Sequence, residues 1–180
     1  MHPVYYLHGY DSSPNGYRAV FLKKRFPLLQ VPQLPNDLGK RVRILEEEIT
    51  GPSFLIGSSL GGLNALIFAH EHPEWVKGLV LLAPAVDFFN PDYKALQLDL
   101  KLESLVIPAG PPTIVIAARK DEVIPLEAVE HLVKKSNEAS ILEFAKLDDV
   151  HLLHGKLSLS TLVRAVETIT GLTAQANPPE

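Results

Sequence analysis

Cysteine is absent from this chain of 180 residues. A disulfide framework, a thiolate zinc site, an iron–sulfur cluster and a cysteine nucleophile are therefore excluded. The chain also has no excess of positive charge, because 17 basic and 21 acidic residues give a formal net charge of −4. Nor does any run approach the roughly 18 uninterrupted apolar residues of a membrane span. We therefore expect neither a nucleic acid nor a membrane as a partner.

A secretory leader is not recognisable either, because residues 1–8 lack a basic segment followed by an apolar run. We expect a cytoplasmic protein. Hydrophobic residues make up 46% of the chain and charged residues 21%, which is typical of a globular domain. We predict one domain over residues 1–172, a small lid-like excursion within it at 87–112, and a frayed C-terminal tail at 173–180.

Short apolar runs alternate along the chain with segments of helical periodicity. The runs predict strands, of which the second can lie only at a sheet edge because Pro32 lacks the N–H that a ladder needs. The predicted strands are Val4–Leu7, Gln30–Leu34, Ser53–Ile56, Gly78–Ala83, Thr113–Ala118 and Ser140–Ala145. Runs that are apolar on both faces are typical of a parallel sheet.

Five segments between these runs predict helices. They are Tyr17–Phe26, Leu38–Ile49, Leu63–His72, Leu126–Lys135 and Ser158–Thr170. The alternation indicates an α/β fold, with a mostly parallel sheet of about six strands and helices on both faces. Residues 87–112 interrupt the alternation, and the aromatic side chains of Phe88, Phe89 and Tyr93 either pack this excursion onto the body or line an acyl pocket.

A sharp strand-to-helix turn is predicted at Gly57-Ser58-Ser59-Leu60-Gly61, which matches the pattern G-x-S-x-G. An apolar strand leads into the turn and an apolar helix follows it, which is the context of a nucleophile elbow. Such a turn lifts the hydroxyl of its central serine clear of the sheet. We identify Ser59 as the candidate nucleophile, with Ser58 as the weaker alternative.

An acyl-transfer serine needs two backbone N–H groups that bind the developing oxyanion. One belongs to the residue after the nucleophile, here Leu60. The loop Leu7-His8-Gly9-Tyr10, at the end of the first predicted strand, offers the N–H of Tyr10 as the second. We interpret His8 as a structural hydrogen-bonding residue.

A carboxylate and then a histidine should follow the nucleophile along the chain. Asp121 comes just after the strand Thr113–Ala118 and is preferred over Glu122 as the acid. His151 follows the last predicted strand and is preferred over His154 as the base. Asp149 either orients this histidine or caps the next helix.

Two motifs resemble the α/β-hydrolase superfamily and, within it, the small YqiA-type esterases. They are Tyr6-Leu7-His8-Gly9-Tyr10-Asp11-Ser12-Ser13-Pro14 and Ile56-Gly57-Ser58-Ser59-Leu60-Gly61-Gly62. The Pro32-Gln33-Leu34-Pro35 stretch is also similar to that group, and the order of elements agrees over nearly the whole chain.

The resemblance implies a compact α/β-hydrolase fold with Ser59, Asp121 and His151 as catalytic triad, and with the backbone amides of Tyr10 and Leu60 as oxyanion hole. It also implies hydrolysis of small-molecule carboxylic esters, best known for short acyl chains, with no metal and no cofactor. A thioesterase, an amidase or an acyltransferase would use the same residues, and a hydrolase fold can also serve as a non-catalytic binding protein. A monomer and a homodimer are both compatible with the sequence.

Overall fold

A computed structural model of the protein describes residues 2–87 and 105–176. Most of the predicted lid-like excursion, including Phe88, Phe89 and Tyr93, lies outside the described residues. The last four residues of the predicted tail lie outside them as well.

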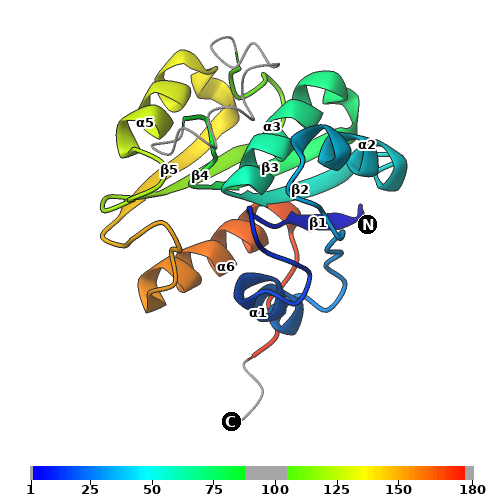
Figure 1. Ribbon diagram of the computed structural model, residues 1–180, viewed down its shortest axis with the longest axis horizontal. Helices are drawn as coiled ribbons and strands as arrows, with labels where there is room; N and C mark the ends of the chain where they lie inside the picture. Colours follow the sequence, from blue (N-terminus) through cyan, green and yellow to red (C-terminus); the bar gives the residue numbers. More distant parts are fainter. Residues whose placement is uncertain (1, 88–104, 177–180) are drawn as a thin grey trace.

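A parallel sheet of five strands forms the centre of the described structure (Figure 1). The strands neighbour one another in chain order and are β1 (Val4–Leu7), β2 (Ser53–Ser58), β3 (Val76–Leu82), β4 (Thr113–Ala118) and β5 (Ile141–Leu147). Every residue of β1 and β4 is buried. This burial explains why these runs carry apolar side chains on both faces rather than at alternate positions.

The second predicted strand, Gln30–Leu34, does not form. The chain makes a single parallel bridge there, in which Tyr6 N donates to Gln30 O at 2.8 Å and Gln30 N donates to Val4 O at 2.9 Å. Pro32 follows two residues later and has no N–H to continue the ladder. The prediction of about six strands was therefore one too many, although the segment does lie at the edge beside β1.

Helices cover both faces of the sheet, as predicted (Figure 1). One face carries α1 (Tyr17–Arg25) and α6 (Lys156–Thr170), whose apolar residues form one core cluster. The other face carries α2 (Leu38–Glu48), α3 (Leu60–Glu71) and α5 (Leu126–Lys135), whose apolar residues form a second cluster. Two short 3₁₀ turns, Pro73–Trp75 and Glu138–Ser140, precede β3 and β5. None of the helices in the described part of the chain is long and apolar enough to cross a membrane.

Helix α3 is buried on nearly its whole circumference, from Leu60 to Ala69. Its sequence is apolar on every face for this reason, since α2 covers the side that does not touch the sheet (Figure 1). The helix also starts three residues earlier than the periodicity predicted, at Leu60, because its first turn is built from Gly61 and Gly62.

The start of the predicted tail is attached to the body. Gln175 N donates to Arg25 O at 2.8 Å, and Ala174 N donates to the Glu167 carboxylate at 2.8 Å. The chain therefore runs from α6 back to the end of α1 instead of fraying at residue 173.

A buried cation, Arg41, joins three parts of the fold near the end of β1. Its side chain is fully buried, and burial lowers its pKa to about 10, so it stays charged at neutral pH. It donates to Asn64 Oδ1 of α3 at 2.6 Å, to Pro35 O at 3.1 Å and to His8 O. Among the described residues these three partners are neutral oxygens, so Arg41 serves as a hydrogen-bond donor rather than as half of an ion pair.

We expect Arg41→Met to lower the free energy of unfolding by about 3 kcal/mol or more, because it leaves three buried acceptors without their donor. Urea unfolding monitored by circular dichroism measures this loss. Arg43→Met is the matched control, since Arg43 is exposed on the same helix, and it should stay within about 0.5 kcal/mol of wild type. Equal effects of the two substitutions would contradict this role of Arg41.

Candidate active site

Ser59 occupies the turn between β2 and α3 in a strained backbone conformation, with φ 52° and ψ −118°. Such a conformation costs about 1–3 kcal/mol in a residue other than glycine and persists only where the surroundings impose it. Here Ser59 N donates to Leu82 O at 2.9 Å. Ser59 O accepts from the backbone N–H groups of Gly62, Leu63 and Ala85. These four bonds hold the turn.

Two glycines make this turn sterically possible. A Cβ on Gly61 would overlap the backbone oxygen of Leu7, and a Cβ on Gly57 would overlap the backbone of Gly61. Any side chain at either position would push the first turn of α3 away from the sheet. The glycines of the motif therefore allow the close approach that the predicted elbow requires.

The candidate acid and base lie at the same edge of the sheet as Ser59. Asp121 follows β4 and His151 follows β5, and parallel strands end at a common edge. The imidazole Nδ1 of His151 lies 2.9 Å from both carboxylate oxygens of Asp121. The Nε2 of the same ring lies 3.1 Å from Ser59 Oγ. The structure thus brings the three candidate residues into one hydrogen-bonded chain.

Burial and two backbone donors at Asp121 fix the direction of the hydrogen bonds among Asp121, His151 and Ser59. The Asp121 side chain is 2% exposed, and Oδ1 accepts from Val123 N at 2.9 Å and from Ile124 N at 2.8 Å. A carboxylate held in this way can only accept, so Nδ1 of His151 carries a proton and donates it. In the neutral ring Nε2 is then the acceptor, and the hydroxyl of Ser59 donates to it.

The alternatives left open by the sequence lie nearby with different contacts. Glu122 accepts from the backbone N of His151 at 3.2 Å, so it contacts the main chain of that residue and not its ring. His154 is mostly exposed, and its Nδ1 lies 3.9 Å from Asp149. The Ser58 hydroxyl is almost fully buried and accepts from Arg18 at 2.6 Å.

Asp149 holds the segment that carries His151. Its carboxylate accepts from Val150 N at 2.8 Å, Gly155 N at 2.9 Å and Ser158 Oγ at 2.6 Å, so it anchors the start of α6. Burial raises the pKa of Asp149, but these hydrogen bonds outweigh that effect and leave the pKa below its usual value. Of the two roles open to Asp149, the structure supports the anchoring of the helix.

The loop after β1 lies against Ser59. A Cβ built on Gly9 would lie 3.4 Å from Ser59 Cβ, so the backbone passes close to the serine. The buried imidazole of His8 fixes this loop, since its Nδ1 donates to Gly9 O at 3.0 Å and its Nε2 accepts from Leu34 N at 3.2 Å. His8 is thus a hydrogen-bonding residue, as its sequence context predicted.

A cavity of about 620 Å³ opens onto Ser59 and His151. This volume is within the range of small-molecule sites. The cavity wall comes from the loop after β1, the start of α1, the elbow and the segments after β4 and β5. Its lining is Tyr6, Gly9, Tyr10, Asp11, Ser12, Tyr17, Arg18, Ser58, Ser59, Val123, His151, Leu152 and His154.

One group of metal-ligating residues exists elsewhere in the described part of the chain. Glu46, Glu71 and His72 place one ligand atom each within 4.8 Å of one another. Both carboxylates are exposed, and none of the three residues lines the cavity at Ser59.

Comparison with known proteins identifies the family of this chain. Residues 30–178 match the Hydrolase_4 family, described as serine aminopeptidase, S33. The chain belongs to this family and is an α/β hydrolase. A curated relative, the mitochondrial palmitoyl-protein thioesterase ABHD10 of Mus musculus, is 29% identical over 119 residues. That match covers 56% of this chain but 40% of the relative, so it spans less than half of that protein.

Solved structures share the fold. Mouse ABHD10 superimposes with a TM-score of 0.79 at 20% identity, covering 94% of this chain and 89% of that chain. A hydrolase of the α/β superfamily from Xanthomonas campestris gives 0.73 at 21% identity, with 96% and 100% covered. Est1E from Butyrivibrio proteoclasticus, solved with bound ferulic acid, gives 0.72 at 15% identity, with 93% and 87% covered.

Sequence reasoning missed two arginines at the site, Arg18 in the cavity wall and Arg41 behind the loop after β1. Each donates to a residue that is distant along the chain, Arg18 to Leu152 O across 134 positions and Arg41 to His8 O across 33. A signal for Arg41 was present in α2, where this charged residue occupies a position on the apolar face together with Leu38 and Leu45.

His8 should make the protein sensitive to mild acid. Burial lowers its pKa and the nearby Arg41 lowers it further, although the bond to Gly9 O opposes the shift. The native state therefore binds fewer protons than the unfolded chain at this residue. The stability that His8 contributes is present above the unfolded pKa of about 6.5 and is lost as the pH falls below it.

We expect His8→Gln, which does not titrate, to flatten the dependence of the unfolding free energy on pH between about 7.5 and 5.5. Urea unfolding at several pH values measures both slopes. His131→Gln is the control, because His131 is exposed on α5, and it should keep the wild-type slope. Identical slopes for wild type and His8→Gln would show that this imidazole is not responsible.

Proposed function

We propose that the protein is a serine hydrolase that cleaves carboxylic esters of short acyl chains through an acyl-enzyme intermediate. Ser59 is the nucleophile, His151 the general base and acid, and Asp121 the residue that orients the imidazole. The observation that carries the proposal is the 3.1 Å contact between His151 Nε2 and Ser59 Oγ, continued by the 2.9 Å contacts of Nδ1 with Asp121.

In the first half of the reaction, Ser59 Oγ attacks the ester carbonyl carbon while His151 Nε2 takes the hydroxyl proton. The carbonyl oxygen becomes an oxyanion beside the N–H groups of Leu60 and Tyr10. As the tetrahedral intermediate collapses, the bond to the leaving oxygen breaks and His151 returns the proton to it. An alcohol departs and the acyl group stays on Ser59.

In the second half, water replaces the alcohol. The oxygen of a water molecule attacks the acyl carbon while His151 Nε2 takes a proton from that water. His151 then gives this proton to Ser59 Oγ as the ester bond between Ser59 and the acyl group breaks. A carboxylic acid is released and the enzyme is restored. Asp121 remains a carboxylate throughout and stabilises the imidazolium that forms twice in the cycle.

The oxyanion site is supported by two features of the fold. The first N–H groups of a helix have no partner inside the helix, and Leu60 is the first residue of α3. Gly9 brings the loop that carries Tyr10 to Ser59. The partial positive charge at the start of α3 favours an anion at the same place.

A thioesterase is the second candidate, because the curated relative ABHD10 is named a palmitoyl-protein thioesterase. The same residues would act on a thioester, with a thiol as the leaving group. Matched oxygen esters and thioesters of acetate, butyrate, octanoate and palmitate would separate the two functions and give the preferred chain length. An oxygen-ester preference at short chain length supports the first proposal, and a palmitoyl-thioester preference supports the second.

A fluorophosphonate probe should label Ser59 in the native protein and should not label the heat-unfolded protein, where the hydrogen-bonded chain is lost. Peptide mass spectrometry locates the modified residue. Ser59→Ala should abolish the label and lower ester turnover by up to roughly 10⁶. Labelling of Ser58 instead, or wild-type turnover in Ser59→Ala, would refute the assignment, and tight ligand binding without turnover would indicate a binding protein.

Asp121→Asn should lower kcat by about 10³–10⁴, because an amide leaves the imidazole in the wrong tautomer to accept the serine proton. Glu122→Gln is the matched control, since Glu122 contacts only the backbone N of His151, and it should lose less than about tenfold. Steady-state kinetics with para-nitrophenyl acetate measures both. A larger loss in Glu122→Gln than in Asp121→Asn would exchange the roles of the two carboxyl groups.

A further inference from the structure

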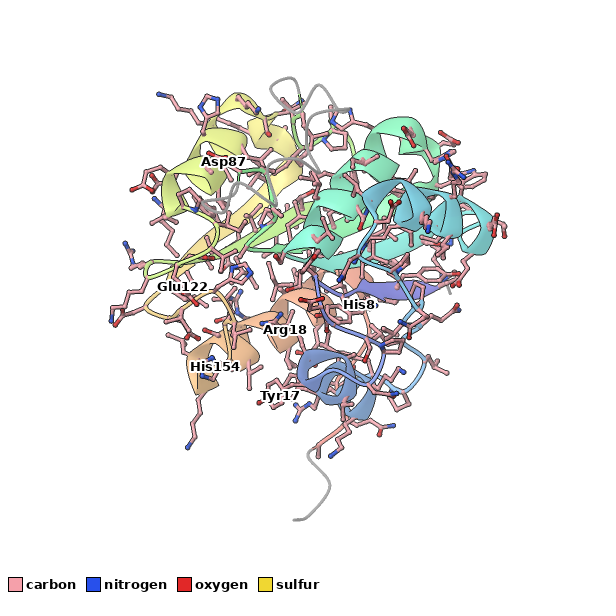
Figure 2. All side chains as sticks on the ribbon, viewed as in Figure 1. His8, Tyr17, Arg18, Asp87, Glu122 and His154 are labelled. Atoms are coloured by element: carbon pink, nitrogen blue, oxygen red, sulfur yellow. The ribbon has the colours of Figure 1, made fainter. Side chains whose placement is uncertain are left out.

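Arg18, at the start of α1, spans the cavity wall between the elbow and the segment after His151. One terminal nitrogen, Nη1, donates to Ser58 Oγ at 2.6 Å, and Nη2 donates to Leu152 O. Figure 2 shows Arg18 between the end of β1, marked by His8, and the segment before α6, marked by His154. The guanidinium therefore borders the same cavity as the nucleophile.

The charge of Arg18 has no counter-charge among the described residues. Its two partners there are a hydroxyl and a backbone carbonyl, both neutral, and its Nε is buried without a hydrogen-bond partner. A guanidinium offers five N–H groups, of which these contacts use two. Because the Nε–H is buried, the donors left for a ligand are the second N–H groups of Nη1 and Nη2, and the cavity wall holds them on a half-buried cation.

The acidic residue of the cavity lining does not compensate this cation. Asp11 is exposed, and its carboxylate accepts from Asn36 Nδ2 at 2.6 Å while its backbone N donates to Asn36 Oδ1 at 3.0 Å. It makes no ion pair with Arg18 within the described part of the chain. The other polar side chains of the lining carry hydroxyls or imidazoles, and they are those of Tyr6, Tyr10, Ser12, Tyr17, Ser58, Ser59, His151 and His154.

We propose that Arg18 selects esters that carry a carboxylate, which binds in the cavity beside Ser59. This inference rests on the proposed hydrolase function and names its substrate class. A carboxylate supplies the missing counter-charge, and the planar guanidinium matches its geometry. The attraction is stronger at the cavity wall than in open water, because the surrounding protein has a lower dielectric constant.

Matched ester pairs test the proposal. They also show whether the carboxylate belongs to the acyl group or to the leaving group of the substrate. The acyl pair is mono-para-nitrophenyl glutarate against para-nitrophenyl butyrate. The leaving-group pair is para-acetoxybenzoate against phenyl acetate. For each pair the quantity is the ratio of kcat/KM for the charged ester to kcat/KM for the neutral one.

Arg18→Met should lower this ratio by about tenfold or more in at least one pair, which is the effect of one hydrogen bond to a charged group. Arg18→Lys keeps the charge and should retain part of the preference. The ratio separates selectivity from general damage to the site. Loss of the contacts to Ser58 and Leu152 can lower kcat/KM for the charged and the neutral ester alike, and such a common loss cancels in the ratio. The preference of the wild type should also fall as salt is added.

Lys24→Met is the matched control, because it removes the same charge from an exposed position on the same helix, and it should change the ratio less than about twofold. A ratio that is equal in wild type and Arg18→Met for both pairs would overturn the inference while ester turnover itself persists. Loss of the proposed function is a different result, namely no turnover of any ester and no fluorophosphonate label at Ser59.

Discussion

The close approach of the first turn of α3 to the ends of β1 and β2 is the constraint on which the candidate site depends. No side chain fits between Gly61 and the backbone of Leu7, so helix and strand meet main chain to main chain. That contact forces Ser59 into a positive φ and turns its hydroxyl out of the sheet. It also brings the start of α3 beside the loop of Gly9, so that one steric contact places the candidate nucleophile next to the two candidate oxyanion donors.

Around this contact, different residues hold the side chain and the main chain of His151. Asp121 binds the ring of His151, whereas Glu122 binds its backbone N. Asp149 anchors the turn that follows. On the opposite side of Ser59, the imidazole of His8 and the guanidinium of Arg41 hold the loop after β1. The imidazole of His151 and the loop beside Ser59 are therefore each held by further residues, as a precise site requires.

Local sequence features predicted the fold class, the five helices of the described residues and the candidate triad. Apolar runs and helical periodicity indicate which segments are buried, and the glycines of the elbow indicate a close approach of two backbones. Each of these features can be recognised within a single segment of the sequence. The strand at Gln30–Leu34 was overpredicted because a segment can lie beside a sheet without forming a full ladder, and Pro32 limits this one to a single bridge. The roles of Arg18 and Arg41 were not predicted because these residues bind partners that are distant in sequence. Ser58 lies 40 positions from Arg18, and His8 lies 33 positions from Arg41.

The separation of the candidate triad along the chain has a consequence for its biosynthesis. Ser59 precedes His151 by 92 residues, and Asp121 precedes it by 30. A ribosome thus completes the elbow long before the candidate base is synthesised, and β5 must join the sheet edge before the imidazole can reach the serine. A nascent chain that ends before β5 lacks the imidazole that lies 3.1 Å from Ser59 Oγ in the folded protein. Acyl chemistry by the candidate triad therefore begins only after β5 and the turn behind it have folded.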